Sequence, residues 1–301
     1  MDAGSRMSSS LKEYIKRNSE RVDRALDRFL PSASTKPSAI HRAMRYSLFA
    51  GGKRLRPILA IAAAEACGGR ASRALAVASA VECIHTYSLI HDDLPCMDDD
   101  DFRRGKPTSH KVFGEGMAVL AGDALLTIAF EIAAASRPTS RYAQADFVRE
   151  LARASGSLFL VAGQAADLEG EGKKISHAQL RFIHERKTSA LLTCAMRLGA
   201  MSANAAPAQL HAVTQAGHNL GMAFQVIDDI LDATKTTEEL GKTAGKDEKF
   251  HKATYPSILG MKRAREEANR FTLAAHRAIR SLGACAFRLK QLSDYLLIRQ
   301  C

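Results

Sequence analysis

The chain reads His91-Asp92-Asp93-Leu94-Pro95-Cys96-Met97-Asp98-Asp99-Asp100-Asp101-Phe102-Arg103-Arg104 directly after a nearly apolar segment. Six of the ten residues from 92 to 101 are aspartates, and each close pair repels by about 1 kcal/mol in water and by more where water is excluded. A fold needs a counter-charge to concentrate that repulsion beside apolar sequence. Hard divalent cations suit this role, because Mg²⁺ binds oxygen ligands and commonly combines one or two carboxylates with substrate phosphates.

A second acidic cluster follows later in the chain, in the sequence Gln225-Val226-Ile227-Asp228-Asp229-Ile230-Leu231-Asp232. Asp228 and Asp232 are four residues apart and therefore share one face of a helix, with Asp229 beside them. The apolar residues around them leave little room for a solvent-exposed acidic helix. With Arg103 and Arg104 directly after the first cluster, the two clusters predict a metal cage around a diphosphate.

Composition favours one large helical domain. The chain has 301 residues, of which 46% are apolar, 25% charged and only 6% aromatic, and alternation of Val, Ile and Thr is scarce. No repeat and no Pro-, Gly- or Ser-rich linker divides it, so we expect a disordered end at residues 1–10 and a single all-α domain at 11–301. The nearly apolar segment Ala71 to Asp92 predicts a central buried helix that Pro95 ends near Asp93. Other helices are expected from Leu11, from Pro37 to about Ala50, from about Leu55 to Cys67, and at about 117–135, 139–163, 177–201, 207–234, 256–282 and 286–298.

Charge and cysteine usage exclude several classes of function. The net charge is +11, but the basic residues form no run of five and no nucleic-acid-binding motif, so no nucleic acid is expected as a partner. A pocket for polyanionic small molecules explains the excess of cations equally well. The six cysteines form no C-x-x-C pair, which argues against a zinc or redox site. Residues 1–10 are polar and no stretch approaches 18 uninterrupted apolar residues, so we expect no membrane span and a cytoplasmic location.

A basic loop provides a candidate anion site. Gly51-Gly52-Lys53-Arg54-Leu55-Arg56-Pro57 leads into a helix, where backbone amides and three cations can bind an anion. Its spacing is not that of a P-loop, so nucleotide hydrolysis is not predicted. His85 lies seven residues before Asp92 on nearly the same helix face. Taken alone, such a histidine is more often a satisfied core residue than a ligand.

Taken together, these motifs resemble the trans-isoprenyl diphosphate synthases, over residues 11 to about 299. Five motifs occur in the order found in that family, at Gly51–Pro57, at His91–Asp98 with Gly105–Thr108, at Lys187-Thr188, at Phe224–Asp232 and at Gly241–Asp247. The resemblance implies an isoprenoid synthase class I fold, a helical bundle with a central cavity. His85 stands where some relatives carry Gln, and both side chains can donate a hydrogen bond.

The resemblance also implies roles for individual residues. Asp92, Asp98 and Asp228 would hold Mg²⁺, three ions per active site, with Asp93, Asp229 and Asp232 in support. The allylic diphosphate would be bound by Arg103, Lys187, Lys242 and Lys252. The diphosphate of isopentenyl diphosphate would be bound by Gly52, Lys53, Arg56, His85 and Arg104. Thr188 and Gln225 would face the developing allylic cation.

The activity implied is a magnesium-dependent, head-to-tail (1′–4) condensation of isopentenyl diphosphate with dimethylallyl or geranyl diphosphate. Mg²⁺ and fixed cations would neutralise the departing diphosphate, and an apolar cavity would shield the carbocation from water. The released pyrophosphate would take the last proton, so no side-chain base is needed. The resemblance implies a symmetric homodimer, and the apolar character of 71–90 and 118–134 exceeds what one core requires.

Product length is predicted from the helix that ends at Asp92. In the resembling family a bulky aromatic five residues before the first aspartate stops elongation, and here that residue is Tyr87, followed by Ser88. The spacer Leu94 to Met97 is similar to that of bacterial farnesyl diphosphate synthases, so a 15-carbon product is expected. Geranylgeranyl diphosphate, with 20 carbons, is the alternative, because some synthases of that product share the spacer and Tyr87 can also be an ordinary core aromatic.

Two other activities compete with this interpretation. A class I terpene cyclase also uses an aspartate-rich motif, but it does not need the second diphosphate site that Gly51 to Arg56 and the Arg103-Arg104 pair predict. A non-catalytic subunit of a prenyl synthase would be expected to lose one aspartate cluster, whereas this chain keeps both.

Overall fold

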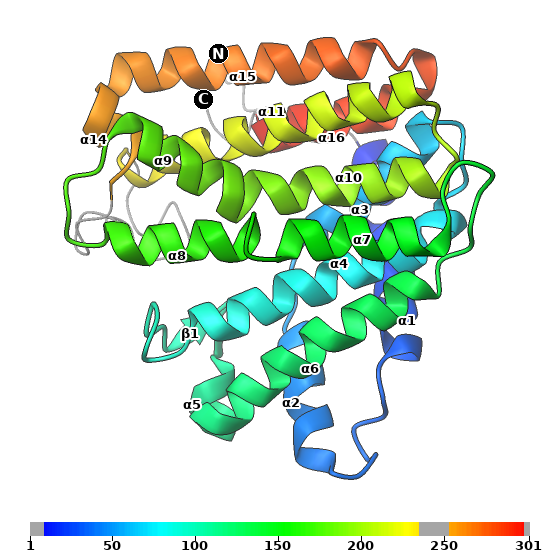
Figure 1. The fold of residues 1–301 in the computed structure, drawn as a ribbon, viewed down its shortest axis with the longest axis vertical. Coiled ribbons are helices and arrows are strands. Elements are labelled where there is room, and N and C mark those ends of the chain that lie inside the picture. Colours follow the sequence, from blue (N-terminus) through cyan, green and yellow to red (C-terminus); the bar gives the residue numbers. More distant parts are fainter. Residues whose placement is uncertain (1–8, 235–252, 298–301) are drawn as a thin grey trace.

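The computed structural model describes residues 9–234 and 253–297. The elements of the first half are α1 (Ser9–Phe29), α2 (Ser38–Leu48), α3 (Leu55–Ala66), α4 (Ala71–Asp92), β1 (Phe102–Arg103), β2 (Lys106–Pro107), α5 (Ser109–Phe113) and α6 (Glu115–Ala134). They are followed by α7 (Gln144–Ser155), α8 (Leu160–Gly170), α9 (His177–His184), the π-helix η1 (Glu185–Ser189), α10 (Ala190–Ser202), α11 (Pro207–Asp232), α14 (Tyr255–Leu259), α15 (Met261–Arg280), the 3₁₀ turn η2 (Ala284–Ala286) and α16 (Phe287–Leu297). Figure 1 shows stacked rows, with α15 above α11, the α9–α10 row, the α8–α7 row, and then α4 and α6.

Helix α4 is the central element of the bundle. It contacts α3, α6 and α10, and most of its residues from Val77 to Ile84 are fully buried. The helix ends at Asp92, as Pro95 predicted, because a proline ring excludes the helical conformation of the residue before it. Much of the apolar character of residues 71–90 is therefore used inside one chain.

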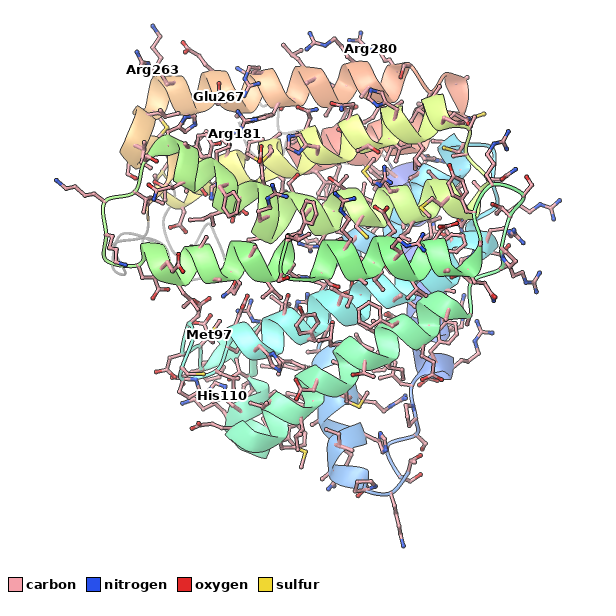
Figure 2. The ribbon with its side chains drawn as sticks, in the orientation of Figure 1. Met97, His110, Arg181, Arg263, Glu267 and Arg280 are labelled. Atoms are coloured by element: carbon pink, nitrogen blue, oxygen red, sulfur yellow. The ribbon has the colours of Figure 1, made fainter. Side chains whose placement is uncertain are left out.

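Helix α15 illustrates how the outer helices are built. Its buried positions Ala264, Ala268, Phe271, Ala275 and Ile279 recur every three or four residues, which gives one apolar stripe against α11. The charged residues Arg263 and Arg280 point away from the bundle in Figure 2. Most of the helical stability of such a segment comes from packing of the apolar face rather than from intrinsic propensity.

Most predicted helices are confirmed, but some boundaries were wrong. The predicted helix 139–163 is two helices, because the chain leaves helical geometry between Gly156, which is extended, and Phe159. The helix predicted at 256–282 is interrupted at Gly260, which has a φ of 78°. Of the predicted disordered end, residues 1–8 lie outside the described part of the chain, whereas Ser9 and Ser10 begin α1.

Helix α6 remains largely uncovered by its own chain. It is 20 residues long and, by length and composition alone, apolar enough to cross a membrane, with 39% of its most apolar window buried. One such helix is weak evidence for a membrane span, because core helices of soluble proteins pass the same test. Val119 and Leu120 are exposed on its surface.

Close helix packing predicts a stability difference between two glycines. A methyl group at Gly199 in α10 would collide with the carbonyl of Ala60 in α3, whereas a methyl group at Gly116 in α6 would meet nothing. Gly199→Ala should therefore lower the free energy of unfolding by about 1–3 kcal/mol. Gly116→Ala, the matched control, should raise it by up to about 1 kcal/mol, because alanine favours helix. Urea unfolding monitored by circular dichroism measures both, and equal values would contradict close α3–α10 packing.

Candidate active site

The first aspartate cluster folds back on the end of α4. The amide of Asp98 donates to the carbonyl of Asp92 at 2.8 Å, and the amide of Asp99 donates to the carbonyl of Leu94 at 3.2 Å. The turn predicted at Pro95 is thereby confirmed, and Asp98 lies next to Asp92. Burial, followed by the charges of Asp98 and Asp93, raises the pKa of Asp92 to about 6, although Lys187 and Arg103 oppose this.

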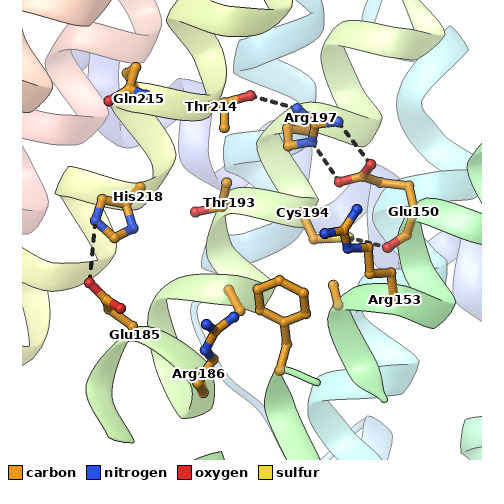
Figure 3. A pocket seen from close by; sticks show the side chains of 13 residues that line it. Glu150, Arg153, Glu185, Arg186, Thr193, Cys194, Arg197, Thr214, Gln215 and His218 are labelled. Carbon is orange, nitrogen blue, oxygen red and sulfur yellow. Dashed lines mark hydrogen bonds and ion pairs between the residues drawn. The ribbon is translucent and has the colours of Figure 1, made fainter. Parts of the chain in front are cut away.

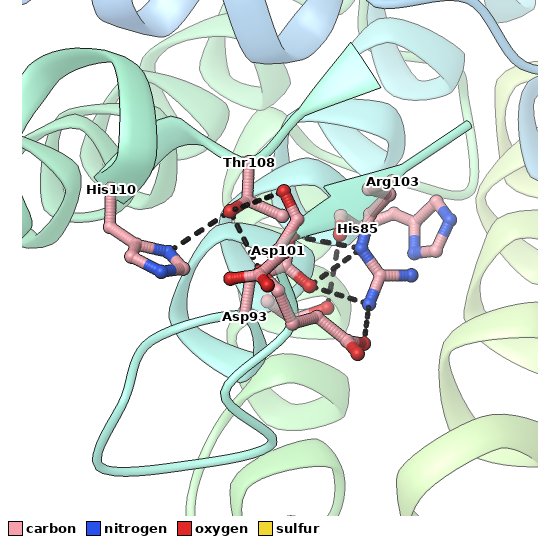
Figure 4. A network of polar contacts seen from close by, with 8 residues as sticks. His85, Asp93, Asp101, Arg103, Thr108 and His110 are labelled. Atoms are coloured by element: carbon pink, nitrogen blue, oxygen red, sulfur yellow. Dashed lines mark hydrogen bonds and ion pairs between the residues drawn. The ribbon is translucent and has the colours of Figure 1, made fainter. Parts of the chain in front are cut away.

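Asp93 is buried and faces a different partner. The Nε of Arg103 donates to both of its carboxylate oxygens, at 2.7 and 2.9 Å, and an Nη of Arg103 donates to Asp100 at 3.3 Å (Figure 4). Arg103 comes from the short hairpin β1–β2, whose two turn residues, Arg104 and Gly105, have φ values of 54° and 74°. Positive φ at both central residues is the geometry of a type I′ turn, which favours glycine at the second position.

A basic wall lies beside this loop. Nη1 of Arg56 donates to Nε2 of His85 at 3.2 Å, and Arg104 donates to the carbonyl of Gly51. Burial, and then the charges of Arg56 and Arg104, hold the pKa of His85 well below its usual range, so its ring is neutral. Burial also lowers the pKa of Arg56 and of Arg104. Because Arg56 and Arg104 are buried close to the same histidine, a bound anion would stabilise their positive charges.

Arg54, which the sequence placed among three anion-binding cations, is instead buried and fixes this wall. Arg54 is 3% exposed and pairs with Asp23 at 2.8 Å and with Glu82 at 3.0 Å. It also donates to the carbonyl of Leu48 at 2.7 Å. Arg54 therefore anchors the Gly51–Pro57 loop, and of the three cations in that loop it is the one turned inward. Its neighbours in sequence, Lys53 and Arg56, are left for other contacts.

The second cluster is ordered by a chain of hydrogen bonds. The hydroxyl of Thr188 donates to Gln225 at 3.0 Å, and the amide of Gln225 donates to Asp229 at 3.3 Å. The other oxygen of Asp229 accepts the backbone N–H of Tyr255 at 2.9 Å. Asp229 is buried, whereas Asp228 lines an adjacent cavity. The predicted pair Thr188–Gln225 is thus brought together.

Lys187 and Thr188 lie on the π-helix η1, between α8 and α11. The Nζ of Lys187 lies 2.6 Å from Asp167 of α8, a residue that sequence reasoning did not select. A methyl group at Gly163 in α8 would collide with the backbone of Lys187, and one at Gly221 in α11 would lie 2.6 Å from the Cα of Ser189. These two glycines let η1 sit close to both neighbours. π-Helical segments are rare and frequently occur at functional sites.

Two cavities meet at η1. One of about 410 Å³ is lined by Arg56, His85, Tyr87, Asp92 and Gln164, and another of about 190 Å³ is lined by Asp167, Asp228 and Asp229. Lys187 and Thr188 line both cavities. Asp92 of the first cluster and Asp228 and Asp229 of the second therefore border adjoining cavities of one cleft.

Tyr87 and Ser88 line the larger cavity, on the last turns of α4 before Asp92. The ring of Tyr87 packs edge-on against His91, with 5.7 Å between ring centroids. Nε2 of His91 lies 3.0 Å from the carbonyl of Val119 in α6, and a methyl group at Gly122 would collide with the imidazole. His91 and Gly122 thereby fix the position of Tyr87, a role that the sequence did not reveal.

Not every predicted site residue lines the cleft. Lys53 is exposed, Arg103 is paired with Asp93 and Asp100, and Asp232 is buried without lining either cavity. The guanidinium of Arg104 lies directly against Gly52, so a side chain at that position would have to displace it. Lys242 and Lys252 lie outside the described residues.

The arrangement suits a metal that is bound jointly with a ligand. Within residues 9–234 and 253–297, no three His, Cys, Asp or Glu side chains converge closely enough to hold a metal ion by themselves. Mg²⁺ does not require such a cage, because it commonly takes one or two carboxylates and completes its shell with water and phosphate oxygens. Asp92 and Asp98 on one wall, and Asp228 on the other, supply carboxylates of this kind.

Residues 37–283 match the family described as Polyprenyl synthetase. The large subunit 1 of a heterodimeric geranylgeranyl pyrophosphate synthase of Arabidopsis thaliana is 48% identical over 294 residues, covering 95% of this chain and 79% of that protein. A geranylgeranyl pyrophosphate synthase of Capsicum annuum is 47% identical over 295 residues, covering 96% of this chain and 79% of that protein. Both relatives are described as chloroplastic.

Among solved structures, an FPP/GFPP synthase of Zymomonas mobilis matches with a TM-score of 0.83 and 34% sequence identity, covering 96% of this chain and 99% of that one. The likeness confirms the predicted fold class, an all-α bundle of the isoprenoid synthase type. It also confirms the resemblance stated from the motifs.

The raised pKa of Asp92 predicts a pH-dependent stability effect in metal-free protein. The folded pKa of Asp92, about 6, exceeds the ordinary value of 3.8, so stability from neutral Asp92 is present below about pH 4 and is lost as pH rises through 6. Asp92→Asn should therefore stabilise the protein in EDTA at about pH 8 and have little effect near about pH 3.5. Two pKa units correspond to about 3 kcal/mol, and partial exposure reduces the expected gain to roughly 1–2 kcal/mol.

Urea unfolding at the two pH values measures this effect. The matched control is Asp99→Asn, because Asp99 belongs to the same loop but is exposed. Its φ of 46° is one that asparagine tolerates. If both substitutions changed the free energy of unfolding equally at the higher pH, the buried charge of Asp92 would not be the cause of the effect.

Proposed function

We propose that this chain, which belongs to the polyprenyl synthetase family and is therefore a prenyltransferase, condenses isopentenyl diphosphate head-to-tail with an allylic diphosphate. The observation that carries the proposal is the cleft itself, where Asp92 and Asp228 border two cavities that share Lys187 and Thr188. Arg56 and His85 line the larger cavity together with several apolar side chains, and the charge of Arg104 acts on both. Two anionic substrates need two cationic sites, and a terpene cyclase would need only one. The pair of sites therefore favours the condensation.

In this proposal Asp92, Asp98 and Asp228 hold Mg²⁺ together with the allylic diphosphate. When bound, Mg²⁺ neutralises the charge that develops on the departing diphosphate. Lys187 lies between the two walls, where its ammonium group can contact the same diphosphate once it leaves Asp167. The number of metal ions, expected to be three, stays a prediction.

The remaining residues position the second substrate and protect the cation. Arg56 and Arg104 bind the diphosphate of isopentenyl diphosphate, and neutral His85 presents one ring N–H to it. Because Nε2 of His85 accepts from Arg56, its proton is on Nδ1. The carbonyl oxygen of Gln225 is held by Thr188, which keeps a fixed dipole facing the cavity. No general base is assigned, because the released pyrophosphate can take the proton.

Two observations bear on product length and favour different products. Both curated relatives described above are named geranylgeranyl pyrophosphate synthases, which supports a 20-carbon product better than the farnesyl diphosphate expected from the sequence. Tyr87 supports the 15-carbon product, because its ring stands in the path of a growing chain and is braced by His91. Geranylgeranyl diphosphate is thus the product that the relatives favour, and farnesyl diphosphate the one that the cavity favours.

A homodimer is the proposed assembly, with α6 at its interface. The support is the uncovered apolar surface of α6, where Val119 and Leu120 are 39% and 54% exposed. A second copy of this chain would bury this helix by a two-fold contact. The cytoplasmic location expected from the sequence stays a prediction.

Metal dependence gives the first test. EDTA should abolish condensation, and added Mg²⁺ should restore it. Asp92→Ala and Asp228→Ala should each lower the rate at least about 10²-fold, the scale of removing one preorganised charge-stabilising group. Asp99→Asn, at an exposed position of the first cluster, is the control and should retain most activity. Full activity in EDTA would exclude the mechanism.

Product chromatography tests the role of Tyr87. Tyr87→Ala should lengthen the main product by at least one five-carbon unit, because the ring that closes the cavity is removed. Tyr87→Phe retains the ring and should leave the length unchanged. A wild type that already makes mainly geranylgeranyl diphosphate would show that Tyr87 does not stop elongation at 15 carbons. The product would then be the one that appears in the names of the relatives.

Light scattering tests the assembly. The wild type should have about twice the chain mass of 32.6 kDa at micromolar concentration. Leu120→Arg should shift it toward the monomer, because a charge on the uncovered face of α6 opposes burial. Leu273→Arg is the control, since Leu273 is 57% exposed on α15, away from α6. A monomeric wild type would contradict the proposal.

A further inference from the structure

A cavity of about 470 Å³ lies outside the cleft, bordered by α7, η1, α10 and α11 (Figure 3). None of the residues that line it lines either cavity of the cleft. Its volume is within the range of about 300–1,000 Å³ typical of small-molecule sites. Phe159 and Cys194 contribute apolar surface, and charged side chains surround them.

Both carboxylates of this cavity already have cationic partners. Glu150 receives two hydrogen bonds from Arg197, at 2.6 and 2.9 Å, and Arg197 also donates to Thr214 at 2.6 Å. Glu185 accepts from Arg181 at 3.0 Å and lies 3.9 Å from Nε2 of His218. These pairs leave no carboxylate of the lining for any further cation.

Two arginines of the lining are left without such a partner. The guanidinium groups of Arg153 and Arg186 lie 5.6 and 4.5 Å from the ring centroid of the same residue, Phe159. Within the described residues, no carboxylate lies within ion-pair distance of either one. The Nε of Arg186 is buried and makes no hydrogen bond. Two cations held near one ring repel each other, and a buried N–H without an acceptor costs about 1–3 kcal/mol.

We propose that this cavity is a second ligand site, which binds a small organic anion with an apolar body. The anionic group would lie between Arg153 and Arg186, where it neutralises both cations and accepts from the Nε of Arg186. The apolar body would pack on Phe159 and extend toward Cys194. A phosphate or a carboxylate would satisfy the arginines, and the apolar lining disfavours a bare inorganic ion.

The site is placed to influence the cleft. Arg186 and Lys187 are consecutive residues of η1, and they line the second site and the cleft respectively. Because the backbone of η1 is held tightly against Gly163 and Gly221, a shift at Arg186 moves Lys187 with it. Occupancy of the second site should therefore change turnover. This consequence rests on the proposed function, whereas the binding itself does not.

The absence of tryptophan from the chain allows a local test of binding. Phe159→Trp introduces the only tryptophan, inside the proposed site. Octyl phosphate, the probe, should produce a saturable change in its emission, whereas inorganic phosphate and 1-octanol should bind at least about tenfold more weakly. Adding Arg153→Gln should weaken octyl phosphate binding at least about fivefold, because an exposed cation near a ligand contributes about 1 kcal/mol. Adding Arg280→Gln, which removes an exposed arginine of α15, should leave it unchanged.

Calorimetry on protein with the native Phe159 tests whether the tryptophan itself alters binding. It should show an octyl phosphate binding event that Arg153→Gln weakens and that remains when the cleft is filled with isopentenyl diphosphate. Absence of saturable binding in both experiments, or equal effects of Arg153→Gln and Arg280→Gln, would overturn the proposal. A change of tryptophan emission on dilution without any probe would assign the cavity to a second copy of the chain and also overturn it.

The effect on turnover is measured separately. Octyl phosphate at saturating substrate should change the condensation rate at least twofold, and Arg153→Gln should require at least fivefold more probe for the same change. An unchanged rate at full occupancy of the second site would overturn the coupling. A protein without any condensation activity in the absence of probe would instead contradict the proposed function, and the binding result would remain valid.

Discussion

Repulsion between carboxylates at the end of a buried helix is the constraint on which the site depends. Asp92, Asp93 and Asp98 are held together where α4 ends, and burial raises the pKa of Asp92 to about 6. Arg103, which donates to Asp93, offsets part of this repulsion. In the proposed function, Mg²⁺ arriving with a diphosphate would offset more of it.

The cationic side of the cleft follows the same logic with opposite sign. Burial lowers the pKa of Arg56 and of Arg104, and burial together with these two charges keeps His85 neutral. Arg54 has two carboxylate partners and holds the loop in place. The two walls therefore differ in the sign of their charge. The acidic wall favours cations and the basic wall favours an anion, which is the arrangement that the proposed function requires for a magnesium-bound diphosphate and a second diphosphate.

Close backbone packing brings these walls to one cleft. Gly163 and Gly221 allow η1 to approach α8 and α11, which carries Lys187 and Thr188 to the junction of the two cavities. Gly122 acts in the same way for His91 and Tyr87. Because protein cores are packed nearly as densely as organic crystals, the position of one side chain constrains the positions of several neighbours. Small residues far from the chemistry therefore help to determine where the reacting groups lie.

The sequence by itself determined the helical class, the end of α4 shortly before Pro95, and both aspartate clusters. These features depend on residue type and on spacing within a few turns, which local backbone geometry translates directly into structure. The partnership of Asp167 with Lys187, the break between α7 and α8, and the bracing of Tyr87 by His91 were decided only by the tertiary structure. Each of the two side-chain pairings requires a particular approach of helices, and no short-range pattern encodes it. The break at Gly156 was missed because a single glycine in a helical pattern is usually tolerated, and surrounding packing decides whether the helix continues.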